Sequence, residues 1–93
     1  MNRRRFLVVA AAAFLLFTGA ASKEEISRLS QVMGWKAGQT IADVGAGAGE
    51  IGFAAALTVG DTGKVYLTEL DEEKRKSLEK EVQQRRLKNA VVV

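Results

Sequence analysis

The sequence predicts an α/β fold: the N-terminal portion of a doubly wound parallel sheet, preceded by an N-terminal signal helix. Three observations lead to this prediction. Short runs of strand-forming residues alternate with segments whose apolar residues recur at helical spacing. The connections between these segments are short, and strands that are joined through a helix pair in parallel. A glycine-rich segment, Asp43–Gly49, includes the end of the first predicted strand and the turn that follows it.

An amphipathic helix and a strand open the predicted domain. The helix is expected over Lys23–Met33, because its apolar residues fall on one face. Ser22 precedes it and Glu25 follows three residues later, which is the pattern of a capping box. Trp35, in the next loop, is interpreted as a packing residue. The strand is expected over Thr40–Val44.

Two further helix–strand units continue the pattern. Asp71 is expected to cap the charged helix, in which the i, i+4 pairs Glu72–Lys76 and Glu81–Arg85 are of a stabilising kind. The run Ala90–Val93 is entirely apolar, which predicts a third strand buried on both faces. The expected bounds are a helix over 50–58, a turn over 60–63, a strand over 64–70 and a helix from 71 to about 86.

The organisation of the chain follows from these elements. Three parallel strands in about 72 residues make a small core, and the chain ends within an apolar strand. We therefore expect residues 22–93 to be the N-terminal part of a larger domain that is truncated here. An open sheet edge exposes unpaired backbone groups, so a dimer formed through this edge is a further expectation.

Residues 1–21 have the three parts of a secretory signal. Arginines occupy positions 3–5, an uninterrupted apolar run extends from Phe6 to Phe17, and small residues suited to cleavage follow. The order Arg-Arg-Arg-Phe-Leu also resembles the twin-arginine export signal. We therefore expect an exported bacterial protein, periplasmic or extracellular. The alternative is an anchor in the inner membrane, because the charge-free stretch to Ser22 is at the short limit of a membrane span.

Charge and composition exclude several kinds of partner. The chain has 14 Lys and Arg against 11 Asp and Glu, and the three arginines at 3–5 account for the whole excess. The remaining domain is neutral, so bulk charge gives no indication of nucleic-acid binding. Because the sequence lacks Cys and His, neither a disulfide nor a zinc site is expected.

The glycine segment predicts a cofactor site. Gly45, Gly47 and Gly49 alternate after Asp43, and glycines let a ligand lie against the bare main chain. The first amides of the helix that follows would face this ligand. Glu69 ends the second predicted strand, and the carboxyl ends of neighbouring parallel strands share one sheet edge. Its two carboxylate oxygens suit the adjacent hydroxyls of a ribose, so a nucleotide-like cofactor is predicted.

These segments resemble class I S-adenosylmethionine-dependent methyltransferases. Residues 43–49 are similar to the first motif of that family, and residues 63–70 and 35–41 are similar to its second-strand segment and its lead-in. The resemblance implies a Rossmann-like methyltransferase fold. It also implies that S-adenosylmethionine, or S-adenosylhomocysteine as product, lies over the glycines, its amino group near Asp43, its ribose on Glu69 and its adenine on Leu70. The cofactor-binding residues so implied are Asp43, Gly45, Ala46, Gly47, Gly49, Glu69 and Leu70.

Other interpretations stay open at this point. The segment Gly47–Gly52 also satisfies the G-x-G-x-x-G pattern of a dinucleotide site. However, Asp43 would then direct a negative charge toward a pyrophosphate. A non-catalytic binding or interaction module is a further alternative. The residues that would contact a methyl acceptor in the family lie beyond Val93, so the sequence offers no candidate catalytic residue and no substrate identity, and the chain alone is expected to be inactive.

Overall fold

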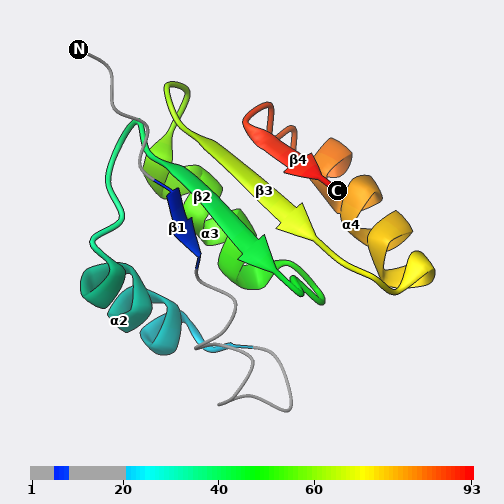
Figure 1. Cartoon of the computed structure of the whole chain (residues 1–93), viewed down its shortest axis with the longest axis horizontal. Helices are drawn as coiled ribbons and strands as arrows, with labels where there is room; N and C mark the ends of the chain where they lie inside the picture. The colour runs from blue at the N-terminus through cyan, green and yellow to red at the C-terminus, as the bar shows by residue number, and fades with distance from the viewer. Residues whose placement is uncertain (1–5, 9–20) are drawn as a thin grey trace.

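The fold is a four-stranded parallel sheet with helices packed against one of its faces (Figure 1). The computed structural model describes residues 6–8 and 21–93. The strands lie in the order β1-β2-β3-β4, and all three neighbouring pairs are parallel. The strands are β1 (Phe6–Val8), β2 (Thr40–Val44), β3 (Lys64–Thr68) and β4 (Ala90–Val92), and the helices are α2 (Lys23–Met33), α3 (Glu50–Val59) and α4 (Glu72–Gln84).

The predicted α/β class and the parallel sheet are confirmed, and α2 and β2 have the predicted bounds. Three elements are shorter than predicted, and β4 is one of them, because it ends at Val92 rather than at Val93. β3 ends at Thr68 rather than at residue 70, where the chain turns toward α4. α4 ends at Gln84, and Arg86 takes a left-handed φ of 55° that a helix cannot continue through.

The sheet has one strand more than the sequence predicted. Phe6–Val8 forms β1 and pairs with β2, so that Leu7 lies opposite Ile41. These three residues belong to the predicted signal helix, and here they are extended. The rest of that helix and the arginines at 3–5 lie outside the described residues. Among the described helices, none has the length and apolar character needed to cross a bilayer.

The core lies between one face of the sheet and the helices. Alternate residues of β2 and β3 point into it, and Ile41, Val65 and Leu67 are fully buried. Phe53 of α3 and Leu78 of α4 join the same core, so both helices cover this face. This alternation follows from the two-residue period of a strand. The burial of apolar side chains on one side of the sheet is therefore what mainly stabilises the fold.

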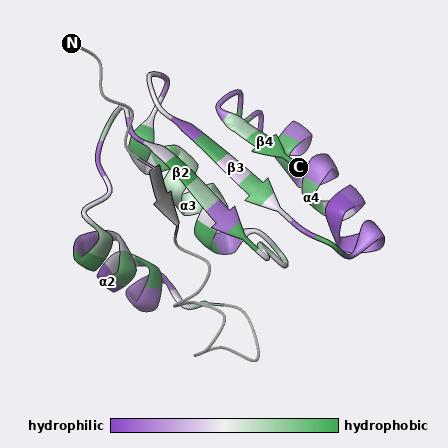
Figure 2. Ribbon diagram, in the orientation of Figure 1, coloured by the Kyte–Doolittle hydropathy of each residue, from purple (hydrophilic) through white to green (hydrophobic). Residues whose placement is uncertain are grey.

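β4 departs from the predicted burial on both faces. Ala90 is buried, but Val91 is 38% exposed and Val93 is 60% exposed. Helices pack against only one face of the sheet, so Ala90 is covered on that face and Val91 lies on the other. Figure 2 shows that α4, the helix beside β4, is largely hydrophilic. Trp35 is buried as predicted, at 7% exposure.

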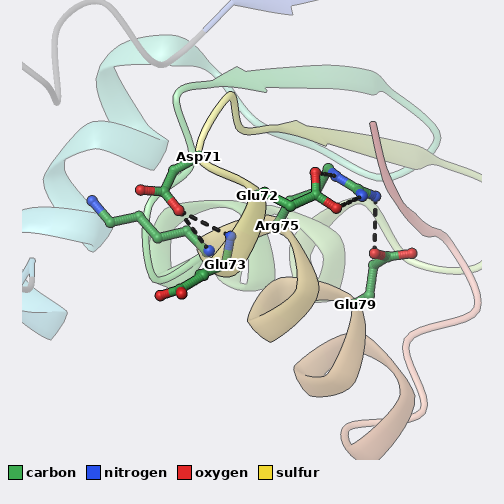
Figure 3. A network of polar contacts seen from close by, with 6 residues as sticks. Asp71, Glu72, Glu73, Arg75 and Glu79 are labelled. Carbon is green, nitrogen blue, oxygen red and sulfur yellow. Dashed lines mark hydrogen bonds and ion pairs between the residues drawn. The ribbon is translucent and has the colours of Figure 1, made fainter.

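The helix termini follow the sequence closely. The capping box at α2 is confirmed: the Ser22 hydroxyl accepts the Glu25 amide, and the Glu25 carboxylate accepts the Ser22 amide. Asp71 caps α4 and accepts two amides of its first turn, at 3.0 and 3.1 Å (Figure 3). These caps fix where each helix begins.

The ion pairs on α4 differ in part from those predicted. Glu81 and Arg85 pair at 2.9 Å as expected. Glu72 pairs with Arg75 at 2.6 Å instead of with a lysine, and Arg75 also reaches Glu79 at 3.0 Å (Figure 3). The planar guanidinium offers several donors in a fixed fork, so it can bind both carboxylates at once, which the ammonium of Lys76 cannot do in the same way.

Candidate functional site

The site is built on the turn between β2 and α3. Gly45, Gly47 and Gly49 all adopt left-handed φ values, of 72°, 59° and 88°. A side chain is strained in this region, so the turn requires glycine. A Cβ on Gly45 or Gly47 would have no heavy atom within 4 Å, so both glycines border open space. The turn therefore presents bare backbone at the carboxyl edge of the sheet.

Gly49 has a different role from the other two glycines. It is buried and forms the N-cap of α3. A Cβ placed on it would lie 2.6 Å from side-chain atoms of Phe53 and Leu78. Its small size therefore lets the turn pack on the core, and its contribution to a cofactor site is to bring the loop close to α3 and α4.

The end of β3 holds the glycine turn through three successive amides. The Gly45 amide donates to the Thr68 hydroxyl at 3.2 Å, and the Ala46 amide donates to the Thr68 carbonyl at 2.8 Å. The Gly47 amide donates to Glu69 Oε1 at 2.9 Å. All three donors are fixed by two adjacent residues. The turn and the acid that follows β3 are thus one connected unit.

Asp43 is a buried carboxylate near this turn. Its side chain is 3% exposed, and its Oδ2 atom has no hydrogen-bond partner among residues 6–8 and 21–93. Burial raises the pKa of Asp43 to about 6; the negative charge of Glu69 adds to the rise, and the nearby Gly52 amide partly offsets it. An unpaired buried oxygen is costly in a folded protein. Asp43 is therefore a buried carboxylate with unused hydrogen-bond acceptor capacity.

Glu69 is half-buried and already accepts two backbone amides. Its Oε2 accepts the Asp71 amide at 3.0 Å, and its Oε1 accepts the Gly47 amide. These two hydrogen bonds, that of Asp71 first, hold the pKa of Glu69 below its usual value. Because its pKa is lowered, Glu69 stays ionised at neutral pH. Each of its carboxylate oxygens can accept a second hydrogen bond, so Glu69 can still bind two neighbouring hydroxyls. Leu70 follows it with its side chain fully exposed.

The structure brings most of the predicted site residues together and adds two that sequence reasoning missed. Glu69 is bonded to the turn that contains Ala46, whereas Leu70 makes no apolar contact with the core. No sequence pattern marks Thr68, because a threonine in a strand is common and no spacing rule applies to it. In the sequence, Gly52 stands out only as the last glycine of the G-x-G-x-x-G pattern. A Cβ there would lie 2.5 Å from Leu67 and 3.0 Å from Asp43 Oδ2, so Gly52 lets α3 approach Asp43.

The carboxylates and the glycine backbone of the site suit an organic cofactor. Within the part of the chain that the structure describes, no group of three or more acidic, Cys or His residues could hold a metal ion. The site combines an unpaired buried carboxylate, two glycines that border open space and a second carboxylate with free acceptor sites. These features fit a ligand that carries a cationic group and two adjacent hydroxyls. An amino-acid nucleoside has both.

Comparison with known proteins gives a matching family and several similar solved structures. A sequence profile described as lysine methyltransferase matches residues 8–93. A SAM-dependent methyltransferase from Aquifex aeolicus is 33% identical, with a TM-score of 0.69 over 74% of this chain and 37% of its own. A protein-L-isoaspartate O-methyltransferase is 18% identical, with a TM-score of 0.74 over 81% of this chain and 24% of its own. The chain thus spans well under half of either protein. No curated protein matches significantly.

Proposed function

We propose, from the premise that this chain belongs to the lysine methyltransferase family, that it is the cofactor-binding part of a methyltransferase. Its cofactor is S-adenosylmethionine, as the sequence predicted, and the Aquifex aeolicus structure is described as depending on the same compound. S-adenosylmethionine supplies a methyl group on a sulfonium, which an acceptor takes by direct displacement. The residues of this chain bind and orient, and positioning is a large part of such catalysis.

The unpaired oxygen of Asp43 is the observation that carries this proposal. Burial removes the hydration of this carboxylate, and within the described chain the nearby Gly52 amide offsets only part of that loss. The ammonium group of the methionine moiety would supply both a positive charge and a donor. Such a partner favours the ionised form and would lower the raised pKa of Asp43. Binding of an amino-acid nucleoside would therefore pair the buried negative charge of Asp43 with a positive one.

The same carboxylate disfavours the dinucleotide alternative. Anions bind at the first turn of a helix, where backbone amides are free. Asp43 Oδ2 already lies against Gly52 in the first turn of α3, and a pyrophosphate placed there would meet a like charge. Glu69 would hold ribose hydroxyls in either case, so it does not separate the two alternatives. Asp43 does.

A binding experiment on the full 93-residue chain tests the proposal. Calorimetric titration with S-adenosylhomocysteine and with NADH should give the tighter complex with S-adenosylhomocysteine. Asp43→Asn and Glu69→Gln should each weaken that complex by about ten-fold or more, because each removes a charge-assisted hydrogen bond. Asp61→Asn is the matched control, since Asp61 is exposed in the turn before β3. Tighter binding of NADH, or no effect of either variant, would contradict the proposal.

We propose a lysine ε-amino group as the methyl acceptor, and the support is the description of the family alone. An amine must be neutral to attack, so a complete enzyme must remove a proton from lysine before transfer. Transfer of labelled methyl groups from S-adenosylmethionine to lysine-containing and isoaspartate-containing peptides, by a preparation of the protein from its natural source, would test this. Labelling that survives removal of all lysines would refute it.

We also propose that residues 1–21 direct export, or alternatively anchor the chain in the inner membrane. The arginines at 3–5 and the apolar run that follows support this. β1 is the competing observation, because cleavage after residue 21 would remove a strand that pairs with β2. The intact mass of the protein from its natural source decides between them. A mass that lacks residues 1–21 supports export, whereas an intact N-terminus together with cytoplasmic fractionation contradicts it.

A dimer through the sheet edge stays a proposal as well. β4 is an edge strand, and Val91 within it and Val93 directly after it are exposed. An exposed apolar edge is a ready template for strand pairing. Sedimentation of the wild-type chain and of Val91→Lys at several concentrations tests it: a dimer that Val91→Lys dissociates supports edge pairing, and a monomer at all concentrations refutes it.

A further inference from the structure

We propose that Thr68 is a positioning residue of the cofactor site, which fixes the first half of the glycine turn for the methionine part of the ligand. This inference rests on the proposed function, because it assigns Thr68 to the same site. Thr68 does not itself touch the ligand in this proposal. It acts through Gly45 and Ala46, and thereby sets where Asp43 and Glu69 stand relative to each other.

Thr68 makes hydrogen bonds to the chain both before and after Val44. Its hydroxyl accepts the Gly45 amide at 3.2 Å and donates to the Asp43 carbonyl at 3.3 Å. Its own carbonyl accepts the Ala46 amide at 2.8 Å. The hydroxyl therefore joins the residue before Val44 to the residue after it. This is the point where the chain leaves β2 and enters the turn.

The Thr68 hydroxyl makes both side-chain contacts through a single oxygen atom. A hydroxyl has one donor and two acceptor sites, so it can serve a carbonyl and an amide at the same time. Valine has the same shape without either capacity, and serine keeps both without the methyl group. The role of the hydroxyl can therefore be tested with two substitutions of similar size, Thr68→Val and Thr68→Ser.

The turn needs these hydrogen bonds because its glycines are conformationally flexible. Gly45 and Gly47 are the most freely rotating residues in the unfolded chain and border open space in the folded one. Each contact that limits them reduces the entropy that a ligand must remove when it orders the turn. The Gly47 amide is held separately by Glu69. Loss of the Thr68 hydroxyl should therefore loosen the Gly45 end of the turn and leave the Gly47 end in place.

This division predicts a difference between two ligands. The resemblance to methyltransferases assigns the glycine turn to the methionine part of the cofactor and Glu69 to the ribose. S-adenosylhomocysteine has both parts, whereas 5′-methylthioadenosine lacks the amino-acid group. A change at Thr68 that acts through the turn should weaken the first ligand and spare the second. A change that merely destabilises the fold would weaken both equally.

The test compares the full-length wild-type chain with Thr68→Val, Thr68→Ser and Thr58→Val. Thr58 is the matched control, because its exposed hydroxyl donates to a backbone carbonyl of α3 at 2.9 Å, away from the turn. Thr68→Val removes both hydroxyl contacts. Titration calorimetry should show that it weakens S-adenosylhomocysteine about five-fold or more, since about five-fold is the factor that corresponds to the net free energy of one hydrogen bond. Its affinity for 5′-methylthioadenosine should stay within about two-fold of wild type. Thr68→Ser and Thr58→Val should resemble wild type with both ligands.

Amide hydrogen exchange in the ligand-free chain gives an independent readout. The Gly45 amide should exchange about five-fold faster in Thr68→Val and at the wild-type rate in Thr68→Ser, while the Gly47 amide is unchanged in both. Unaltered S-adenosylhomocysteine binding by Thr68→Val, equal weakening of both ligands, or no rescue by serine would overturn the inference alone. If the wild-type chain binds neither ligand, the proposed function fails and the inference fails with it.

Discussion

The substitution Asp43→Asn should stabilise the protein at neutral pH while it weakens cofactor binding. Burial raises the pKa of Asp43 from 3.8 to about 6, so the folded chain holds this proton more tightly than the unfolded chain does. At a pH above both values the carboxylate is ionised in both states, and its ionisation opposes folding. A shift of this size corresponds to about 3 kcal/mol at most.

The sign of the pH dependence follows from the direction of this shift. Below the unfolded pKa the carboxyl is protonated in both states and costs nothing. As the pH rises from 3.8 to about 6, the unfolded state loses its proton first, so the free energy of unfolding falls through this window. The amide of the asparagine variant does not titrate. Its advantage over wild type should therefore grow by about 1 kcal/mol between about pH 5 and about pH 8.

Urea unfolding of wild type, Asp43→Asn and the exposed control Asp61→Asn at these two pH values measures the difference directly. The difference between wild type and Asp43→Asn isolates Asp43 from other carboxylates, including Glu69, whose lowered pKa acts in the opposite direction. The reasoning is refuted if Asp43→Asn is less stable than wild type at about pH 8, or if the two proteins show parallel pH profiles. A gain in stability with a loss of binding would show that the fold retains a costly charge for its ligand.

Three substitutions test the packing and the caps. Gly52→Ala should lower the free energy of unfolding by about 2 kcal/mol in spite of alanine's better helix propensity, because its Cβ would lie 2.5 Å from Leu67; an unchanged urea midpoint would contradict the close approach of α3. Asn89→Ala should cost about 1–2 kcal/mol, since the side-chain amide donates to two carbonyls at the end of α3, at 2.8 and 2.9 Å; thermal unfolding measures this, and an equal Tm would argue against it. Ser22→Ala should cost about 1 kcal/mol in α2 and speed exchange of the Glu25 amide; an unaltered exchange rate would show that the hydroxyl does not protect it.

Much of the fold could be predicted because its signals are local. The bounds of α2 and β2, the capping box at Ser22 and the Asp71 cap each depend on residues within a few positions of one another. The alternation of glycines after Asp43 likewise predicted a turn, and in that turn all three glycines adopt left-handed φ values. Helical spacing, caps and glycine turns require only neighbours in the chain, and a sequence displays those directly.

The sequence by itself determined the parallel α/β fold, the glycine turn and the residues that could serve an S-adenosylmethionine site. The tertiary structure alone decided that Thr68 and Glu69 accept hydrogen bonds from three amides of that turn. The side-chain contact of Thr68 joins residues 23 positions apart, and that of Glu69 joins residues 22 positions apart. It also decided that Asp43 lies unpaired against Gly52 and that Phe6–Val8 adds a strand. Such contacts depend on strand register and on how closely a helix approaches the sheet. No local pattern encodes these quantities, because they result from packing the whole core at once.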